Sequence, residues 1–157
     1  VQRLLQLLLL VQLLQLLLYF KLIGIHSQLD GYKLAFNLNK FLKISLENFD
    51  YKIVVDGVEC TFEMFKHESE TYNTKVYLFS NKSFGNIRAF EPNLFDTIKS
   101  NIYLIDEKKN IDFFLKITGG GFNYVSMINK IQEIRMVQSC YLVNLKSPKS
   151  KYNLIFE

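Results

Sequence analysis

The chain has 157 residues, of which 49% are hydrophobic and 22% charged, and its 19 Lys and Arg against 15 Asp and Glu give a formal net charge of +4. This length suits one domain with a real core, and the apolar content excludes a wholly disordered chain. Two cysteines and two histidines exclude a disulfide-dense scaffold and leave little material for a zinc site, so we expect neither a metal nor a cofactor. The mildly basic balance permits a nucleic-acid partner without demanding one.

Lysine, asparagine, isoleucine, phenylalanine, tyrosine and leucine dominate the composition, whereas alanine occurs only at Ala35 and Ala89. The abundant residues have codons that are mostly rich in A and T. This bias indicates an AT-rich genome, such as that of an organelle or a protist. Abundant lysine and asparagine therefore need no functional explanation of their own.

Residues 1–23 form a leucine- and glutamine-rich segment that we expect to be one helix. An apolar stripe with alternating spacings of three and four residues is typical of a helix that packs on a partner, and it consists of Leu4, Leu7, Val11, Leu14 and Leu18. Further leucines widen the apolar surface around most of the helix, which predicts burial on more than one side.

Three interpretations of this helix remain open. It docks into a protein partner or its own domain, it associates with a membrane, or it is a targeting segment. Glutamines along one half of the helix argue against a simple membrane span. Arg3 is the only charge before Lys21, whereas a transit peptide is richer in arginine and serine.

Residues 24–73 read as an extension that contains a β-hairpin. Gly24 and the stretch 26–31 are expected to end the first helix, and residues 32–49 fit either a short helix or a strand. An Asp-Gly pair separates two β-rich runs within residues 51–65, which is a strong hairpin signal. Alternate residues of the second run are expected to face inward, namely Val58, Cys60, Phe62 and Met64. We expect Cys60 to be a small buried hydrophobe and His67 a solvated loop residue.

Residues 74–157 alternate strand and helix patterns. The pattern predicts strands at 75–80, 85–90 and 111–118, and helices at 93–101 and 122–141. The fold class is therefore α+β: a small mixed β-sheet packed by helices, in the order strand, strand, helix, strand, helix, with the leucine-rich helix appended at the N-terminus. We divide the chain into a docking helix (1–23), an extension with a hairpin (24–73) and an α+β core (74–157).

Gly119, Gly120 and Gly121 follow the last of these strands and precede a helix. Glycines let backbone N–H groups approach a phosphate, and a helix N-terminus adds a favourable field. The phosphate-loop and dinucleotide-binding patterns are both absent from this turn. Three interpretations remain: a tight structural turn, a nucleotide site of an enzyme, or a contact with the phosphates of RNA.

A longer pattern surrounds these glycines in residues 102–135. A leucine and an aspartate two residues apart are followed by an acidic residue, alternating apolar positions, three glycines, and basic residues nine and fourteen positions after the last glycine. The matching positions are Leu104, Asp106, Asp112, Phe113, Leu115, Ile117, Gly119, Gly120, Gly121, Lys130 and Arg135. This span resembles the core of the small-subunit ribosomal protein nine family of bacterial and mitochondrial type. Weaker similarity extends it to residues 74–153.

The resemblance has departures. Val125 stands where the family has glutamine, and the small residues of the family's helix are larger here. The chain ends on Glu157, whereas the family ends in a basic tail that reaches tRNA, so the tRNA contact is not carried over. The small-subunit ribosomal protein eleven family is a rival, because Phe84, Arg88, Pro92 and Pro148 align with it.

The resemblance implies a structural constituent of the small ribosomal subunit of mitochondria, located in the matrix on the ribosome, that binds rRNA and has no enzymatic role. The expected RNA-binding residues are Gly119, Gly120, Gly121, Tyr124, Lys130, Arg135, Lys75, Lys82, Arg88, Lys146, Lys149 and Lys151. Neighbouring ribosomal proteins are the expected partners of the leucine stripe.

Two alternatives to this ribosomal role remain. The chain is an organellar interaction or membrane-associated subunit that uses its first helix and has no RNA role, or it is a phosphate-handling enzyme that uses the glycine turn. The sequence supplies the enzyme with no convincing base or set of metal ligands.

Overall fold

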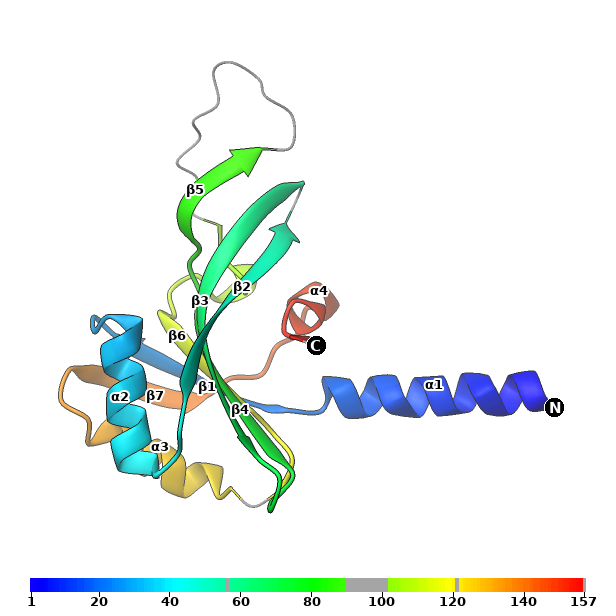
Figure 1. Cartoon of the computed structure of the whole chain (residues 1–157), viewed down its shortest axis with the longest axis horizontal. Helices are drawn as coiled ribbons and strands as arrows, with labels where there is room; N and C mark the ends of the chain where they lie inside the picture. The colour runs from blue at the N-terminus through cyan, green and yellow to red at the C-terminus, as the bar shows by residue number, and fades with distance from the viewer. Residues whose placement is uncertain (56, 90–101, 121, 157) are drawn as a thin grey trace.

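The structure is a computed structural model that describes residues 1–55, 57–89, 102–120 and 122–156. It confirms the α+β class: a seven-stranded sheet is packed by helices, and helix α1 (Gln2–Leu18) extends away from it (Figure 1). The strand order is β2-β3-β4-β6-β1-β7, and β5 also pairs with β3. Every pairing between these strands is antiparallel.

The expected hairpin is confirmed as β2 (Glu47–Val55) and β3 (Val58–Ser69), with Val55 opposite Val58 across a short turn. Gly57 has a φ of +77°, which a glycine adopts without steric cost. Cys60, Phe62 and Met64 are buried as expected; the side chain of Val58 lies outside the described part of the structure. His67 lies within β3 rather than in a loop, because the strand continues to Ser69.

The strand predictions of the second half are also confirmed. They correspond to β4 (Thr74–Ser80), β5 (Phe84–Ala89) and β6 (Phe113–Thr118). The polar connection before β6 holds a short 3-10 turn, η1 (Asp106–Lys108). The expected helix at 93–101 lies outside the described residues.

The first helix ends earlier than expected, because Lys21–Ser27 is strand β1 and pairs with β6 on one side and β7 on the other. Ile23 and Ile25 are fully buried on one face of this strand. Gly24 belongs to the strand rather than to a helix end. A Cβ at this position would approach Val143 Cγ2 to 2.9 Å, so glycine permits the close packing there.

The expected helix over residues 122–141 is wrong in its second half. Helix α3 (Tyr124–Gln132) stops, Met136 takes a φ of +77°, and β7 (Val137–Leu142) follows. The backbone N–H and C=O groups of these residues form hydrogen bonds with β1, in place of the hydrogen bonds that they would form within a longer helix. The described residues also form helices α2 (Gly31–Leu42) and α4 (Pro148–Tyr152).

The sheet is buried on both faces. Helices α2 and α3 cover one face, whereas the C-terminal segment with α4 lies on the other side (Figure 1). Alternation along β4 shows the two cores: Val76 and Leu78 point into the first, and Tyr77 and Phe79 into the second. Helix α2 presents buried Leu34, Leu38 and Leu42 to the first core at four-residue spacing.

The second core contains an unusual polar contact. Lys116 is only 5% exposed, and its ammonium donates a hydrogen bond of 2.7 Å to the carbonyl oxygen of Leu154. The rings of Phe20, Tyr77 and Phe156 lie 5.0–5.3 Å from this nitrogen. Aromatic faces attract a cation, so this lysine fixes the C-terminal segment to the sheet.

Candidate nucleic-acid interface

The glycine turn is held tightly against the neighbouring strand. Gly119 has a φ of +87°, and a Cβ there would collide with the carbonyl oxygen of Asn73. The hydroxyl of Thr74, at the start of β4, donates a hydrogen bond to the carbonyl oxygen of Gly120. These contacts hold Gly119 and Gly120 against the start of β4, and Gly120 remains exposed at the surface.

Helix α3 begins directly after this turn. The Asn123 side-chain oxygen accepts a hydrogen bond of 3.1 Å from the backbone N–H of Ser126, which is a standard helix N-cap. This cap fixes Tyr124 as the first helical residue. The positive end of the helix dipole consequently lies next to the turn.

A small hollow opens beside the turn, on the sheet face that carries α3. Its volume is about 150 Å³, and its lining consists of Tyr19, Lys21, Ile117, Gly119, Phe122 and Tyr124. The Lys21 ammonium lies 5.2 Å from the centroid of the Tyr124 ring, in cation–π geometry. Tyr19 is 70% exposed. We refer to these six residues as the turn hollow.

Sequence reasoning found only part of this arrangement. Gly119 and Tyr124 were expected RNA contacts, whereas Tyr19, Lys21 and Phe122 were not. Tyr19 and Lys21 were assigned to the leucine-rich helix. Both residues follow Leu18, the last residue of the leucine stripe, so the end of the stripe was the one signal that the helix stops there. The pairing of Lys21 with Ile117 brings them to the turn, and no local pattern predicts that register.

The other expected RNA contacts are spread over the molecule. Lys130 on α3 and Arg135 after it are exposed on the side of the turn hollow. Lys75, the second residue of β4, lies on the opposite face with its ammonium 3.9 Å from the Glu68 carboxylate, and Lys82 lies beyond the other end of that strand. Lys146, Lys149 and Lys151 belong to the C-terminal segment on the second face. Gly121 and the side chain of Arg88 lie outside the described residues.

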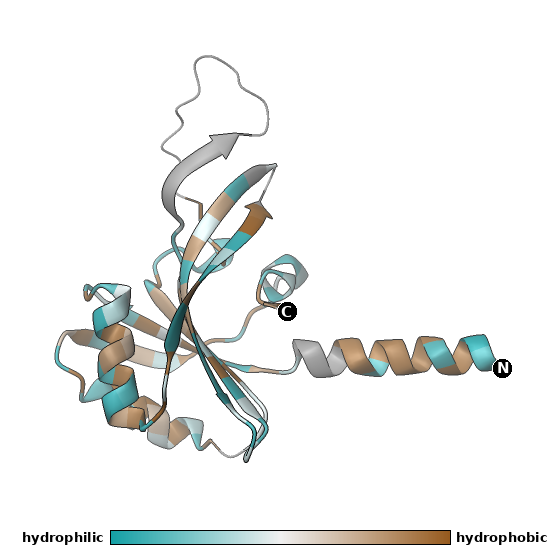
Figure 2. Cartoon of the chain, in the orientation of Figure 1, coloured by the Kyte–Doolittle hydropathy of each residue, from teal (hydrophilic) through white to brown (hydrophobic). Residues whose placement is uncertain are grey.

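Helix α1 carries the leucine stripe and is apolar along most of its length (Figure 2). Leu4, Leu7, Val11 and Leu14 are between 38% and 65% exposed; the side chain of Leu18 is not among those described. These side chains belong to neither core of the sheet. Within the described residues, no helix is long and apolar enough to cross a membrane.

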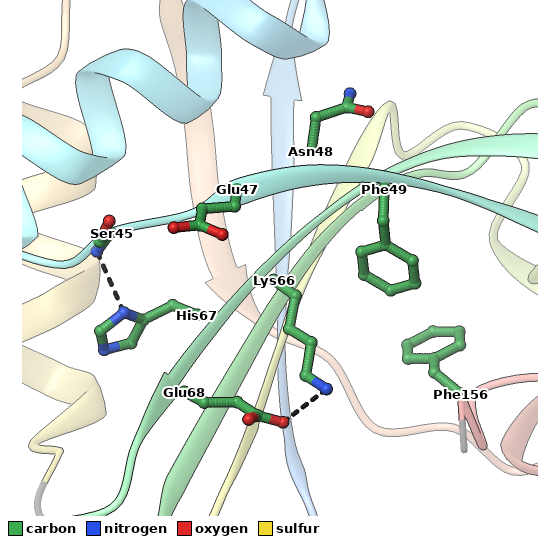
Figure 3. A pocket seen from close by; sticks show the side chains of 8 residues that line it. All are labelled: Ser45, Glu47, Asn48, Phe49, Lys66, His67, Glu68 and Phe156. Atoms are coloured by element: carbon green, nitrogen blue, oxygen red, sulfur yellow. Dashed lines mark hydrogen bonds and ion pairs between the residues drawn. The ribbon is translucent and has the colours of Figure 1, made fainter.

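A larger hollow of about 530 Å³ lies near the start of β2 (Figure 3). Phe49 and Phe156 form its apolar end. At its polar end, Lys66 forms an ion pair with Glu68, and His67 Nδ1 accepts a hydrogen bond of 3.1 Å from the backbone N–H of Ser45 (Figure 3). Because these polar groups satisfy one another, this hollow is a weaker candidate than the turn hollow.

The thiols offer little chemistry. Cys60 and Cys140 are both buried, and burial raises the pKa of the Cys140 thiol to about 12, so this group stays protonated near neutral pH. Among the described residues, no group of three or more His, Cys, Asp or Glu is placed to hold a metal ion.

No protein-family model matches the chain, and no curated protein is significantly similar to it.

Proposed function

We propose that the chain is a structural, RNA-binding subunit of a mitochondrial small ribosomal subunit, without catalytic activity. The observation that carries the proposal is the turn hollow. Three aromatic rings and a lysine gather beside the glycine turn and the N-terminus of α3. Aromatic side chains stack on RNA bases, whereas cations, exposed backbone N–H groups at glycines and a helix N-terminus bind phosphates.

Charge on the same side of the sheet supports the proposal. Lys21 lies at the turn hollow, and Lys130 and Arg135 follow along and after α3. Phosphate contacts supply much of the affinity for RNA, and exposed lysine and arginine side chains make them. The resemblance of residues 74–153 to the protein nine family points to the same class of partner.

Helix α1 gives this subunit an attachment to a neighbouring protein. The helix extends away from the sheet, and its described leucine side chains are exposed on most of its sides (Figure 1). A helix that is apolar on nearly all sides requires burial by a partner. In a protein-rich ribosome this partner is a neighbouring subunit.

Sedimentation of a mitochondrial lysate through sucrose gradients of rising salt concentration tests the proposal. We expect the protein to co-migrate with small-subunit rRNA and to dissociate only at high salt. Ribonuclease treatment should shift it to lighter fractions. Migration independent of the rRNA at all salt concentrations would contradict the proposal.

The exposure of α1 favours a second candidate, an interaction or membrane-associated subunit that has no RNA role. The same lysate distinguishes it. In that case the protein stays in the membrane pellet after a carbonate wash, or stays in one protein complex after ribonuclease treatment.

A further inference from the structure

We infer that the turn hollow binds one unpaired base of single-stranded RNA. This inference rests on the proposed RNA-binding function and specifies its ligand. The hollow has a volume of about 150 Å³, which is on the scale of a single planar base and too small for a base pair. None of its six lining residues is acidic.

The lining has the chemistry of a base-stacking platform. Tyr19, Phe122 and Tyr124 supply aromatic faces from two separate parts of the chain, the entry to β1 and the start of α3. Every base has a π-face, so stacking on such rings tolerates any sequence. Bases inside an A-form duplex are covered by their neighbours, and therefore only an unpaired base reaches these rings.

Lys21 defines where the sugar–phosphate backbone runs. Its ammonium lies over the Tyr124 ring, 5.2 Å from the centroid, so a base that stacks on this ring displaces the ammonium toward the neighbouring phosphate. Gly120 is exposed beside the hollow. Apart from Gly120 and its chain neighbours, no atom of the described residues lies within 4 Å of the position that a Cβ of Gly120 would occupy, so the backbone of an RNA strand can approach closely there.

The rigid parts around the hollow reduce the entropic cost of binding. The contacts of Gly119 with Asn73 and the hydrogen bond from Thr74 hold Gly119 and Gly120 in place, and the Asn123 cap fixes the first turn of α3. Tyr124 is partly buried against the first core. The ring that receives the base is consequently in place before binding.

Binding of the full chain to two RNA oligonucleotides tests the inference. One is an unstructured single strand with a 5-iodouracil, and the other places the same sequence in a hairpin duplex. We expect the single strand to bind at least tenfold more tightly. Because iodouracil crosslinks to stacked aromatic rings under ultraviolet light, we expect crosslinks at Tyr19, Phe122 or Tyr124 in peptide mass spectra.

Substitutions distinguish base stacking on the aromatic rings from general electrostatic attraction to RNA. Stacking on one aromatic ring is worth roughly 1–3 kcal/mol by alanine substitution, so Tyr124→Ala should weaken single-strand binding by about 5- to 150-fold. Tyr124→Phe should retain most of the affinity. Tyr19→Ala should also weaken binding, and its exposed position leaves the fold intact. Tyr152→Ala, an exposed tyrosine on α4, is the matched control and should bind like the parent protein.

The outcomes distinguish the two levels of the proposal. If the protein binds RNA but prefers the duplex, or if neither Tyr124→Ala nor Tyr19→Ala changes the affinity, the base site is wrong while the RNA-binding function stands. If neither RNA binds at low salt, the proposed function fails as well. Iodouracil crosslinks that map only outside the turn hollow would likewise show that the base site is wrong.

Discussion

Two adjacent glycines in the turn have opposite tolerance to a side chain. Gly119 combines a φ of +87° with a Cβ position that is blocked by the Asn73 carbonyl, whereas the Cβ position of Gly120 is open. We expect Gly119→Ala to lower the free energy of unfolding by at least about 2 kcal/mol, because the left-handed backbone and the collision both oppose a methyl group. Urea denaturation followed by circular dichroism measures this loss.

Gly120→Ala is the matched control for that substitution. It should change the free energy of unfolding by less than about 0.5 kcal/mol, as exposed substitutions usually do. Equal effects of the two substitutions on the free energy of unfolding would show that Gly119 is not packed against the Asn73 carbonyl as described. A loss of RNA binding in Gly120→Ala without loss of stability would support a close approach of the nucleic acid at this residue.

The buried Lys116 makes a separate prediction about the C-terminal segment. Lys116→Met keeps the apolar stem but removes the donor to the Leu154 carbonyl and the cation among the three rings. A hydrogen bond from a charged donor contributes about 2 kcal/mol, so the segment should open at least tenfold more often. Global stability should change less, because removing the cation also removes its desolvation cost.

Carboxypeptidase digestion checks the Lys116 prediction. The terminal residues should be released at least tenfold faster in Lys116→Met than in the parent protein, if opening limits the release. Lys130→Met, at an exposed position on α3, is the control and should be digested at the parent rate. Unchanged release in Lys116→Met would mean that Phe156 and Leu154 hold the segment by apolar packing alone.

At the scale of elements, local patterns predicted some elements and missed others for a physical reason. The Asp-Gly turn and the alternating residues of β3, β4 and β6 are visible within a few residues, and these strands are confirmed. The residues of β1 were assigned to the end of the first helix and the segment after it, and most of β7 was assigned to the second predicted helix. These segments become strands through long-range pairing: β1 pairs with β6 on one side and, on the other, with β7, which lies about 115 residues away in the chain.

The candidate site shows the same limit. The glycine turn and Tyr124 were predicted because they are contiguous in sequence. Lys21 and Tyr19 join them through the pairing of β1 with β6, which no spacing reveals. Lys75 was grouped with the turn, and the pleat of β4 places it on the opposite face, near Glu68.

The described side chains of helix α1 lie outside both cores, so its proposed docking role can be tested separately from the stability of the fold. Leu7→Gln with Leu14→Gln should abolish co-migration with the ribosomal small subunit under the proposed function. It should change the free energy of unfolding by less than about 0.5 kcal/mol per site, because both side chains are exposed and lie outside both cores. Gradient sedimentation and urea denaturation measure the two effects.

Gln6→Ala with Gln12→Ala is the matched control on α1, since both glutamines lie off the leucine stripe. This variant should co-migrate like the parent protein. If it detaches as readily as the leucine variant, the stripe is not the docking surface. If the leucine variant unfolds, α1 packs on the sheet in solution.

At the scale of the whole molecule, two groups of basic residues lie on opposite faces of the sheet. Lys21, Lys130 and Arg135 lie on the side of the turn hollow, and Lys146, Lys149 and Lys151 lie on the side of the C-terminal segment. Acidic residues of the β2–β3 hairpin, such as Glu59 and Glu68, offset them. The net charge of +4 is therefore a sum over basic and acidic regions of the chain.

The salt dependence of RNA binding tests which face meets the nucleic acid. For a single strand, the slope of log K against log salt concentration changes by about 0.7 for each phosphate contact. Lys21→Ala should reduce the slope by about that amount, because its ammonium lies at the turn hollow. Lys151→Ala, on the other face, should leave the slope unchanged. Equal reductions in both variants would mean that the RNA contacts both faces, and a reduction in Lys151→Ala alone would move the interface to the C-terminal segment.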